Sequence, residues 1–106
     1  MGDRAEEGRV YNNLGIVWSN LGDVQKAIDY HNLQLNIATE MRDKAAEGRT
    51  YGNLGNDYLA LGDLKKSIDY HMLHLKIAEE VENRKDQGRA YSSLGIAFHK
   101  DRKSVV

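Results

Sequence analysis

The sequence predicts an all-α fold, an α-solenoid built from antiparallel pairs of helices, and three observations support this prediction. First, a block of 40 residues repeats, because Asp3–Met41 returns as Asp43–Val81 and a partial third copy covers residues 83–100. Second, proline is absent, which favours long uninterrupted helices. Third, apolar residues recur at the three- and four-residue spacings of a helical face. Repeats of this length bury their apolar faces against neighbouring repeats. We therefore predict a single domain over residues 1–106, with a non-repeat tail at residues 101–106.

An aromatic and leucine pattern predicts the first helix of each repeat. In the first copy, Tyr11, Leu14 and Trp18 lie on one helical face. The dipeptide Gly22-Asp23 then ends this helix and begins the next. Glycine readily adopts the left-handed conformation at a helix C-terminus, and aspartate accepts hydrogen bonds from the N–H groups of the following N-terminus. Each repeat is therefore expected to hold two helices.

The second helix carries a wider apolar stripe, which runs from Val24 to Ala38 in the first copy. A stripe of this width fits a helix that is contacted on two sides. Further helix starts are signalled at Asp3, Asp43 and Asn83. The sequence thus predicts five helices, near residues 4–20, 23–41, 44–60, 63–81 and 84–100.

Two sets of residues recur inside the first helices. Glycine costs about 1 kcal/mol relative to alanine in a helix, so we expect a glycine that recurs there to make room for a closely packed partner helix. These glycines are Gly15, Gly55 and Gly95. A second repeat position is always aromatic and is predicted to lie in the core: Trp18, Tyr58 and Phe98.

Composition excludes several classes of function. Cysteine is absent and the formal net charge is −1 with acids and bases interspersed, which argues against disulfides, thiolate metal sites, nucleic-acid binding and a membrane-surface patch. The longest apolar runs are far shorter than a membrane span, and the polar N-terminus does not resemble a signal peptide. No catalytic or phosphate-binding motif is visible. We expect a cytoplasmic protein that is not an enzyme and needs no cofactor.

The repeat resembles a known family. Its pattern of an aromatic residue, Leu-Gly, a second aromatic and a small residue opening the second helix is similar to that of tetratricopeptide repeats. The residues that carry the resemblance are Tyr11, Leu14, Gly15, Trp18 and Ala27, then Tyr51, Leu54, Gly55, Tyr58 and Ser67, then Tyr91, Leu94, Gly95 and Phe98.

Two departures narrow this resemblance. The usual tetratricopeptide repeat has about 34 residues and closes with proline, whereas this one has 40 residues and no proline. The runs EGR-x-Y-x-NLG at residues 7–15 and AIDYH-x-x-x-L-x-IA at residues 27–38 are similar to those of Pins-type G-protein-signalling modulators and of tetratricopeptide repeat protein 28. The second helix of each unit is therefore expected to be longer than usual.

The resemblance implies a superhelical scaffold whose first helices line a concave groove that binds a peptide segment of a partner protein. By that resemblance, the groove positions are Arg9, Asn12, Asn13, Ile16, Arg49, Asn53, Asn56, Arg89, Ser93 and Ile96. The arginine ladder, which is the set Arg9, Arg49 and Arg89, suits carboxylates on an acidic partner. The alternative is that each arginine pairs with an acid of an adjacent helix, such as Glu7 or Asp29, and braces the stack.

Binding of a chaperone C-terminus is not expected. Asn53 and Arg89 match positions of the clamp with which some tetratricopeptide domains hold the C-terminal carboxylate of chaperones, but Asn12, Ile16 and Ser93 do not.

A metal site is not expected either. His71 and His74 have a spacing that two metal ligands can share. His31 occupies the repeat position of His71 with Gln34 after it, so packing or hydrogen bonding is the better interpretation.

Two rival functions remain open from the sequence. The chain could be a purely structural spacer within a longer array, or a regulatory region of a larger signalling protein or enzyme. The departure from the repeat after Lys100 leaves the last first-type helix without a partner, so we also expect an exposed apolar face through which the chain can self-associate.

Overall fold

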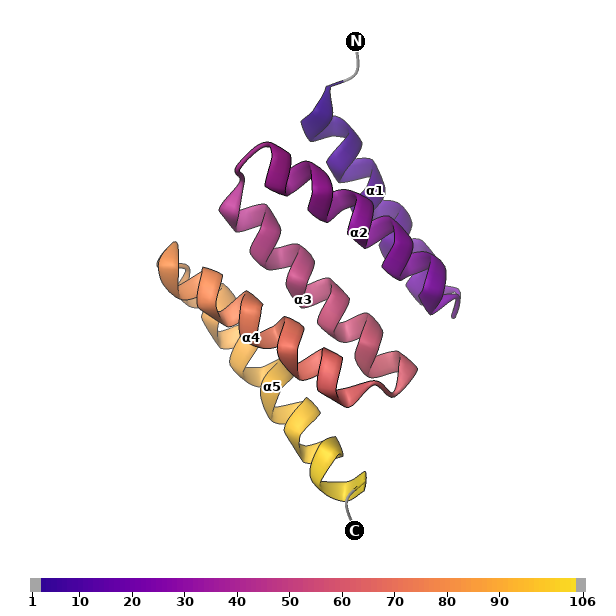
Figure 1. Cartoon of the computed structure of the whole chain (residues 1–106), viewed down its shortest axis with the longest axis vertical. Coiled ribbons are helices and arrows are strands. Elements are labelled where there is room, and N and C mark those ends of the chain that lie inside the picture. Colours follow the sequence, from indigo (N-terminus) through magenta and orange to yellow (C-terminus); the bar gives the residue numbers. More distant parts are fainter. Residues whose placement is uncertain (1–2, 105–106) are drawn as a thin grey trace.

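A computed structural model describes residues 3–104 of the chain and shows five α-helices in that range (Figure 1). Their order and sequence spacing follow the repeat, so that α1, α3 and α5 are first helices and α2 and α4 are second helices. The bounds are α1 Arg4–Asn20, α2 Val24–Glu40, α3 Lys44–Leu61, α4 Leu64–Glu80 and α5 Arg84–Ser104. None of these helices, in the part of the chain that is described, is long and apolar enough to cross a membrane.

The helices form an open stack rather than a closed bundle. Each helix packs mainly on the next one in sequence, and α3 also contacts α5. The stack measures 54 × 33 × 17 Å, with α1 toward one end, α3 in the middle and α5 toward the other end (Figure 1). This arrangement confirms the predicted all-α solenoid of helix pairs.

Capping side chains fix where the helices begin. The Asp3 carboxylate accepts from the Ala5 N–H at 3.0 Å, and Asp23 and Asp63 accept from the N–H groups three residues later at 3.1 Å. Asn83 does the same for α5, because its side-chain oxygen accepts from the Asp86 N–H at 3.0 Å. These contacts satisfy backbone donors that have no partner within a helix.

Two kinds of turn alternate along the stack. Within a repeat, Gly22 and Gly62 have φ values of +90° and +84° and end the first helix as predicted. Between repeats, the left-handed position is held by Arg42 and Glu82, each with φ of +56°. Residues with a side chain adopt this conformation at a cost of roughly 1–2 kcal/mol, and the sequence analysis did not anticipate them.

The glycines inside the first helices receive histidine rings from the second helices. A Cβ atom on Gly15 would stand 2.5 Å from the His31 ring, and one on Gly55 would stand 2.7 Å from the His71 ring. His31 and His71 are 2% and 1% exposed. The glycine–histidine contacts therefore set the distance between the two helices of each repeat, as the recurrence of glycine predicted for these two positions.

The end of the chain differs from the prediction in two ways. Helix α5 continues to Ser104 instead of ending near Lys100, so four residues of the predicted tail are helical. No glycine interrupts this stretch, and Arg102 and Lys103 lie in the last turn, where positive charge is favourable. Phe98, predicted to lie in the core, is 46% exposed, because no second helix covers α5 within the described part of the chain. Residues 105–106 of the predicted tail lie outside the described residues.

Candidate functional site

A groove of about 560 Å³ runs along the stack and is lined by side chains from all five helices. The structure brings together eight of the ten residues predicted for it: Arg9, Asn12, Ile16, Arg49, Asn53, Asn56, Arg89 and Ser93. Asn13 and Ile96 are exposed but do not belong to its lining. Because the lining comes from three successive repeats, the groove suits an elongated ligand more than a compact one.

The arginine ladder places one guanidinium group from each repeat along this groove. Arg9 forms an ion pair with Glu6 one turn away on α1, and Arg89 approaches Asp86 on α5 at 3.6 Å. Arg49 has no carboxylate within ion-pair distance among the residues of the described range. The Arg9 and Arg89 side chains are 70% and 64% exposed, and Arg49 is exposed as well.

The acids proposed as bracing partners make other contacts. The Glu7 carboxylate pairs with Arg4 at 2.9 Å, and Asp29 accepts from the Gln25 amide at 3.2 Å. Arg4 also pairs with Glu40 at 2.8 Å and thereby joins α1 to the end of α2. The ion pair that links different helices at this end of the stack is thus made by Arg4 and not by the ladder.

The asparagines connect adjacent first helices. The Asn53 side-chain amide on α3 donates to the Asn12 side-chain oxygen on α1 at 3.0 Å. This hydrogen bond spans the groove wall between the first and second repeats. It leaves Asn12 its own N–H donors and Asn53 its carbonyl oxygen, which are groups that can pair with a peptide backbone.

Polar side chains of the second helices form the floor of the groove, and the sequence analysis did not assign them to the site. His71, His74 and Gln34 all line the groove, and the two histidines are 1% and 7% exposed. Both ring nitrogens of His71, Nε2 of His74 and Oε1 of Gln34 find no hydrogen-bond partner within the described structure. The available sequence signal was the joint change of Asn12 and Gln34 in the first repeat to Gly52 and His74 in the second.

Burial keeps the floor histidines uncharged at neutral pH. Desolvation, with a smaller contribution from His74, lowers the pKa of His71 to about 4. Desolvation also lowers the pKa of His74, while the charge of Asp86 opposes this shift and the charges of Arg89 and Arg49 add to it. The floor can therefore donate and accept hydrogen bonds without contributing positive charge at neutral pH.

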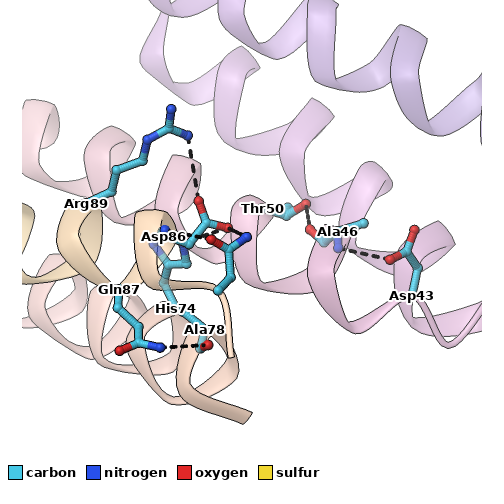
Figure 2. A network of polar contacts seen from close by, with 9 residues as sticks. Asp43, Ala46, Thr50, His74, Ala78, Asp86, Gln87 and Arg89 are labelled. Carbon is cyan, nitrogen blue, oxygen red and sulfur yellow. Dashed lines mark hydrogen bonds and ion pairs between the residues drawn. The ribbon is translucent and has the colours of Figure 1, made fainter. Parts of the chain in front are cut away.

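A polar network joins α5 to α4 beside His74 (Figure 2). Asp86 Oδ2 lies 4.0 Å from His74 Nε2 and accepts from the Asn83 amide at 3.3 Å. The Gln87 side chain donates to the Ala78 carbonyl oxygen of α4 at 3.3 Å. These contacts hold the start of α5, and with it Arg89, in place at the end of the groove.

A second buried pair of histidine and aspartate lies between α2 and α3. His31 Nε2 and Asp57 Oδ2 are 3.7 Å apart, and both side chains are almost fully buried. They border a small hollow of about 150 Å³ that Ser19, Asn53 and Asn56 also line. Burial raises the pKa of Asp57 to about 7 and lowers that of His31, which favours an uncharged pair at mildly acidic pH. Sequence reasoning missed Asp57, whose repeat counterparts are Val17 and Ala97.

Nothing in the described part of the chain resembles a metal centre. Residues 3–104 contain no group of three or more histidine, cysteine, aspartate or glutamate side chains that could hold a metal ion. The arrangement can hydrogen-bond a chain laid along the groove and can attract its carboxylates.

Comparison with known proteins identifies the family. The sequence profile described as tetratricopeptide repeat matches residues 6–80. In structure the chain is similar to the crystal structure of the TPR domain of Arabidopsis FLU, with a TM-score of 0.86 and 18% sequence identity over 92% of this chain and 82% of that one. No match was found among curated proteins. The chain belongs to the tetratricopeptide repeat family, whose members serve in general as non-enzymatic modules of protein–protein interaction.

Proposed function

We propose that this chain is an interaction module that binds an acidic peptide segment of a partner protein in its groove. The observation that carries the proposal is that Arg9, Arg49 and Arg89, one from each repeat, line a single groove of about 560 Å³. A segment that crosses three repeats can place several carboxylates against these guanidinium groups. The neutral floor of His71 and His74 then offers hydrogen bonds to the same segment.

The existing ion pairs of the ladder are weak obstacles to such a ligand. The pair of Arg9 with Glu6 is exposed, and exposed ion pairs contribute roughly 0–1 kcal/mol, so a ligand carboxylate can replace Glu6 at little cost. The Asp86 side chain is only 10% exposed, so a ligand carboxylate would approach the exposed side of Arg89 without displacing Asp86. Arg49, which has no such partner in the described structure, requires no exchange. We expect Arg49 to contribute most to the binding of an acidic ligand.

The alternative function is a purely structural spacer in a longer array. The hydrogen bond from Asn53 to Asn12 favours it, because this contact joins two repeats and uses groove side chains without a ligand. In that case the groove residues stabilise the stack, and no ligand depends on the charge of the ladder.

Charge reversal separates the two functions. An array of peptides about ten residues long, graded in glutamate content, would be probed with the wild-type chain and with the Arg9→Glu, Arg49→Glu, Arg89→Glu variant. The matched control is Lys65→Glu, Lys76→Glu, Lys100→Glu, which makes the same change of charge at exposed positions outside the groove lining.

Groove binding predicts that glutamate-rich peptides bind the wild-type chain and the control variant, and that binding weakens as salt increases. Reversal of the ladder should abolish this binding while the helical circular dichroism signal stays the same. Equal binding by all three proteins, or binding that does not depend on glutamate content, would instead support the spacer. The similarity to Pins-type modulators, a signalling role and a cytoplasmic location remain predictions.

A further inference from the structure

The small hollow beside His31 and Asp57 adjoins the groove. It has a volume of about 150 Å³ and is lined by residues of α1, α2 and α3. Three of these residues, Ile16, Asn53 and Asn56, also line the groove. A ligand that lies in the groove can therefore insert one side chain into the hollow.

The α3 wall of the hollow is polar where the other copies of the repeat are apolar. The dipeptide Asn56-Asp57 stands where the first and third copies have Ile16-Val17 and Ile96-Ala97. Helix α5 packs on α4 as α3 packs on α2, and Ala97 is 0% exposed in α5. A small apolar side chain thus suffices at this position where the next two repeats meet. The carboxylate of Asp57 is therefore not needed to stack one repeat on another.

Asp57 is buried without a group that neutralises it. Its side chain is 4% exposed, and Oδ2 accepts no hydrogen bond from the residues of the described range. No lysine or arginine of that range lies within ion-pair distance of it. The Nε2 atom of His31, at 3.7 Å, is too distant for a hydrogen bond. Because a buried carboxylate without a donor is unfavourable, a cation that enters the hollow gains a contact that no described residue provides.

We propose that the hollow is a specificity subsite of the groove, which receives one lysine side chain of the bound acidic peptide and places its ammonium group beside Asp57. This inference rests on the proposed groove function and adds a second feature to the ligand, an acidic segment that contains a lysine. The ammonium group has three N–H donors, and the lining offers acceptors on Asp57, Asn53 and Asn56. The Asn53 oxygen remains available, because its bond to Asn12 uses the amide N–H.

Lysine fits this subsite better than arginine does. Its charge is compact and sits on a flexible apolar stem, whereas the guanidinium group of arginine is planar and needs acceptors for five N–H groups. The stem can pack along Ile16, which is 43% exposed. Folding has already removed Asp57 from water, so only the lysine loses hydration when the pair forms.

The test measures the binding of fluorescently labelled peptides to the full chain by anisotropy at about pH 8. Asp57 is ionised there, because burial raises its pKa to about 7. The peptides are about ten residues of glutamate and alanine, with a single lysine moved through every position. A matched set carries norleucine instead, which keeps the apolar stem without the charge.

The key variant is Asp57→Asn, which keeps the shape of the side chain and removes its charge. A second variant, Asp57→Ala, copies the residue that the third repeat has in Ala97. The matched control is Asp69→Asn, which removes a carboxylate at an exposed position of α4. Equal circular dichroism spectra would confirm that all three variants fold.

We expect at least one lysine peptide to bind the wild-type chain and Asp69→Asn about tenfold or more tightly than its norleucine counterpart. This preference should disappear in Asp57→Asn and Asp57→Ala, while the norleucine peptides bind all four proteins alike. The arginine ladder repels a lysine, so the general attraction between the groove and acidic peptides works against this result. A preference for lysine therefore reports on the hollow alone.

Two outcomes would overturn this inference and leave the groove function intact. One is a lysine preference that persists without the Asp57 carboxylate, and the other is norleucine peptides that bind as well as lysine peptides at every position. If no peptide of either set binds, the groove function fails as well. Calorimetric titration with butylammonium chloride tests a free amine as the source of the same charge. If Asp57→Asn abolishes saturable binding of this amine and the peptides show no lysine preference, a small amine occupies the hollow and the assignment to a peptide lysine is wrong.

Discussion

The substitution Asp57→Asn should stabilise the chain at alkaline pH and have little effect at acid pH. Asp57 is 3% exposed, and its Oδ2 finds no hydrogen-bond partner within the described structure. The Nε2 atom of His31 lies 3.7 Å from this oxygen, and His31 is also buried and has a lowered pKa. Above neutral pH the wild-type chain therefore holds a buried negative charge that a neutral isosteric amide does not carry.

The pKa of Asp57 sets the size and the sign of this effect. Burial raises it from 3.8 to about 7, so the folded state binds this proton more tightly than the unfolded state does. The contribution to stability is then fully present below pH 3.8 and is lost as pH rises toward 7. At 1.36 kcal/mol per pKa unit, the difference between these two values sets an upper bound of roughly 4 kcal/mol.

The assay is urea denaturation followed by circular dichroism at about pH 4 and about pH 8. His31 makes an opposite contribution, because its lowered pKa favours the folded state as pH rises. It is present in both proteins, so the difference between wild type and Asp57→Asn isolates Asp57. Asp69→Asn, at an exposed position of α4, is the matched control. We expect the advantage of Asp57→Asn to grow by roughly 2–4 kcal/mol between the two pH values. An advantage that stays constant with pH would refute the buried carboxylate as its cause.

Three other predictions follow from the packing. Gly55→Ala should destabilise the chain by about 1–3 kcal/mol because its Cβ would meet the His71 ring. Gly95→Ala meets nothing within 4 Å in the described structure and should stabilise the chain by up to about 1 kcal/mol. Thermal melts in which both variants shifted the melting temperature in the same direction would contradict the helix spacing. Arg42→Gly should stabilise the chain by up to about 1 kcal/mol, seen as a higher melting temperature, because glycine adopts the left-handed φ of this position without strain. The control is Arg42→Ala, whose melting temperature should stay at the wild-type value. Gly52→Asn alone should destabilise the chain because its Cβ would stand 2.8 Å from His74 Nδ1. Adding His74→Gln, which restores the pair of the first repeat, should recover most of the loss, and a double-mutant cycle with no coupling energy would count against this contact.

Local signals explain why the helices could be predicted from the sequence. Asp3, Asp23 and Asn83 cap their helices through short side-chain contacts that depend on neighbouring residues alone. The left-handed conformation of Gly22 and Gly62 is likewise a local property of glycine. The left-handed Arg42 was missed because arginine gives no such signal, although the N–H groups of Arg42 and Asp43 donate to the carbonyl oxygens of Thr39 and Ala38 and close the turn around it.

The site was predicted less completely because burial depends on which helix covers which face. The resemblance to tetratricopeptide repeats implied most residues of the groove wall, since each repeat contributes the same positions. The floor was not predicted, because His71 and His74 belong to α4 and reach the groove past Gly55 and Gly52 of α3, which leave them room. The same reason applies to Asp57, which reads as a surface residue until α2 is packed on it. It also applies to Phe98, which reads as a core residue although its face is open.

The contact between Gly52 and His74 has a consequence for how such an array can change over evolutionary time. Positions that hold the helices of a repeat together, such as Gly55 with His71, are the same in both complete repeats. The pair Gly52 and His74 stands where the first repeat has Asn12 and Gln34, and all four residues line the groove. Each repeat can thus exchange one matched pair on its inner surface while its helices keep their spacing, so the chemistry of the groove lining can change repeat by repeat without any change of fold.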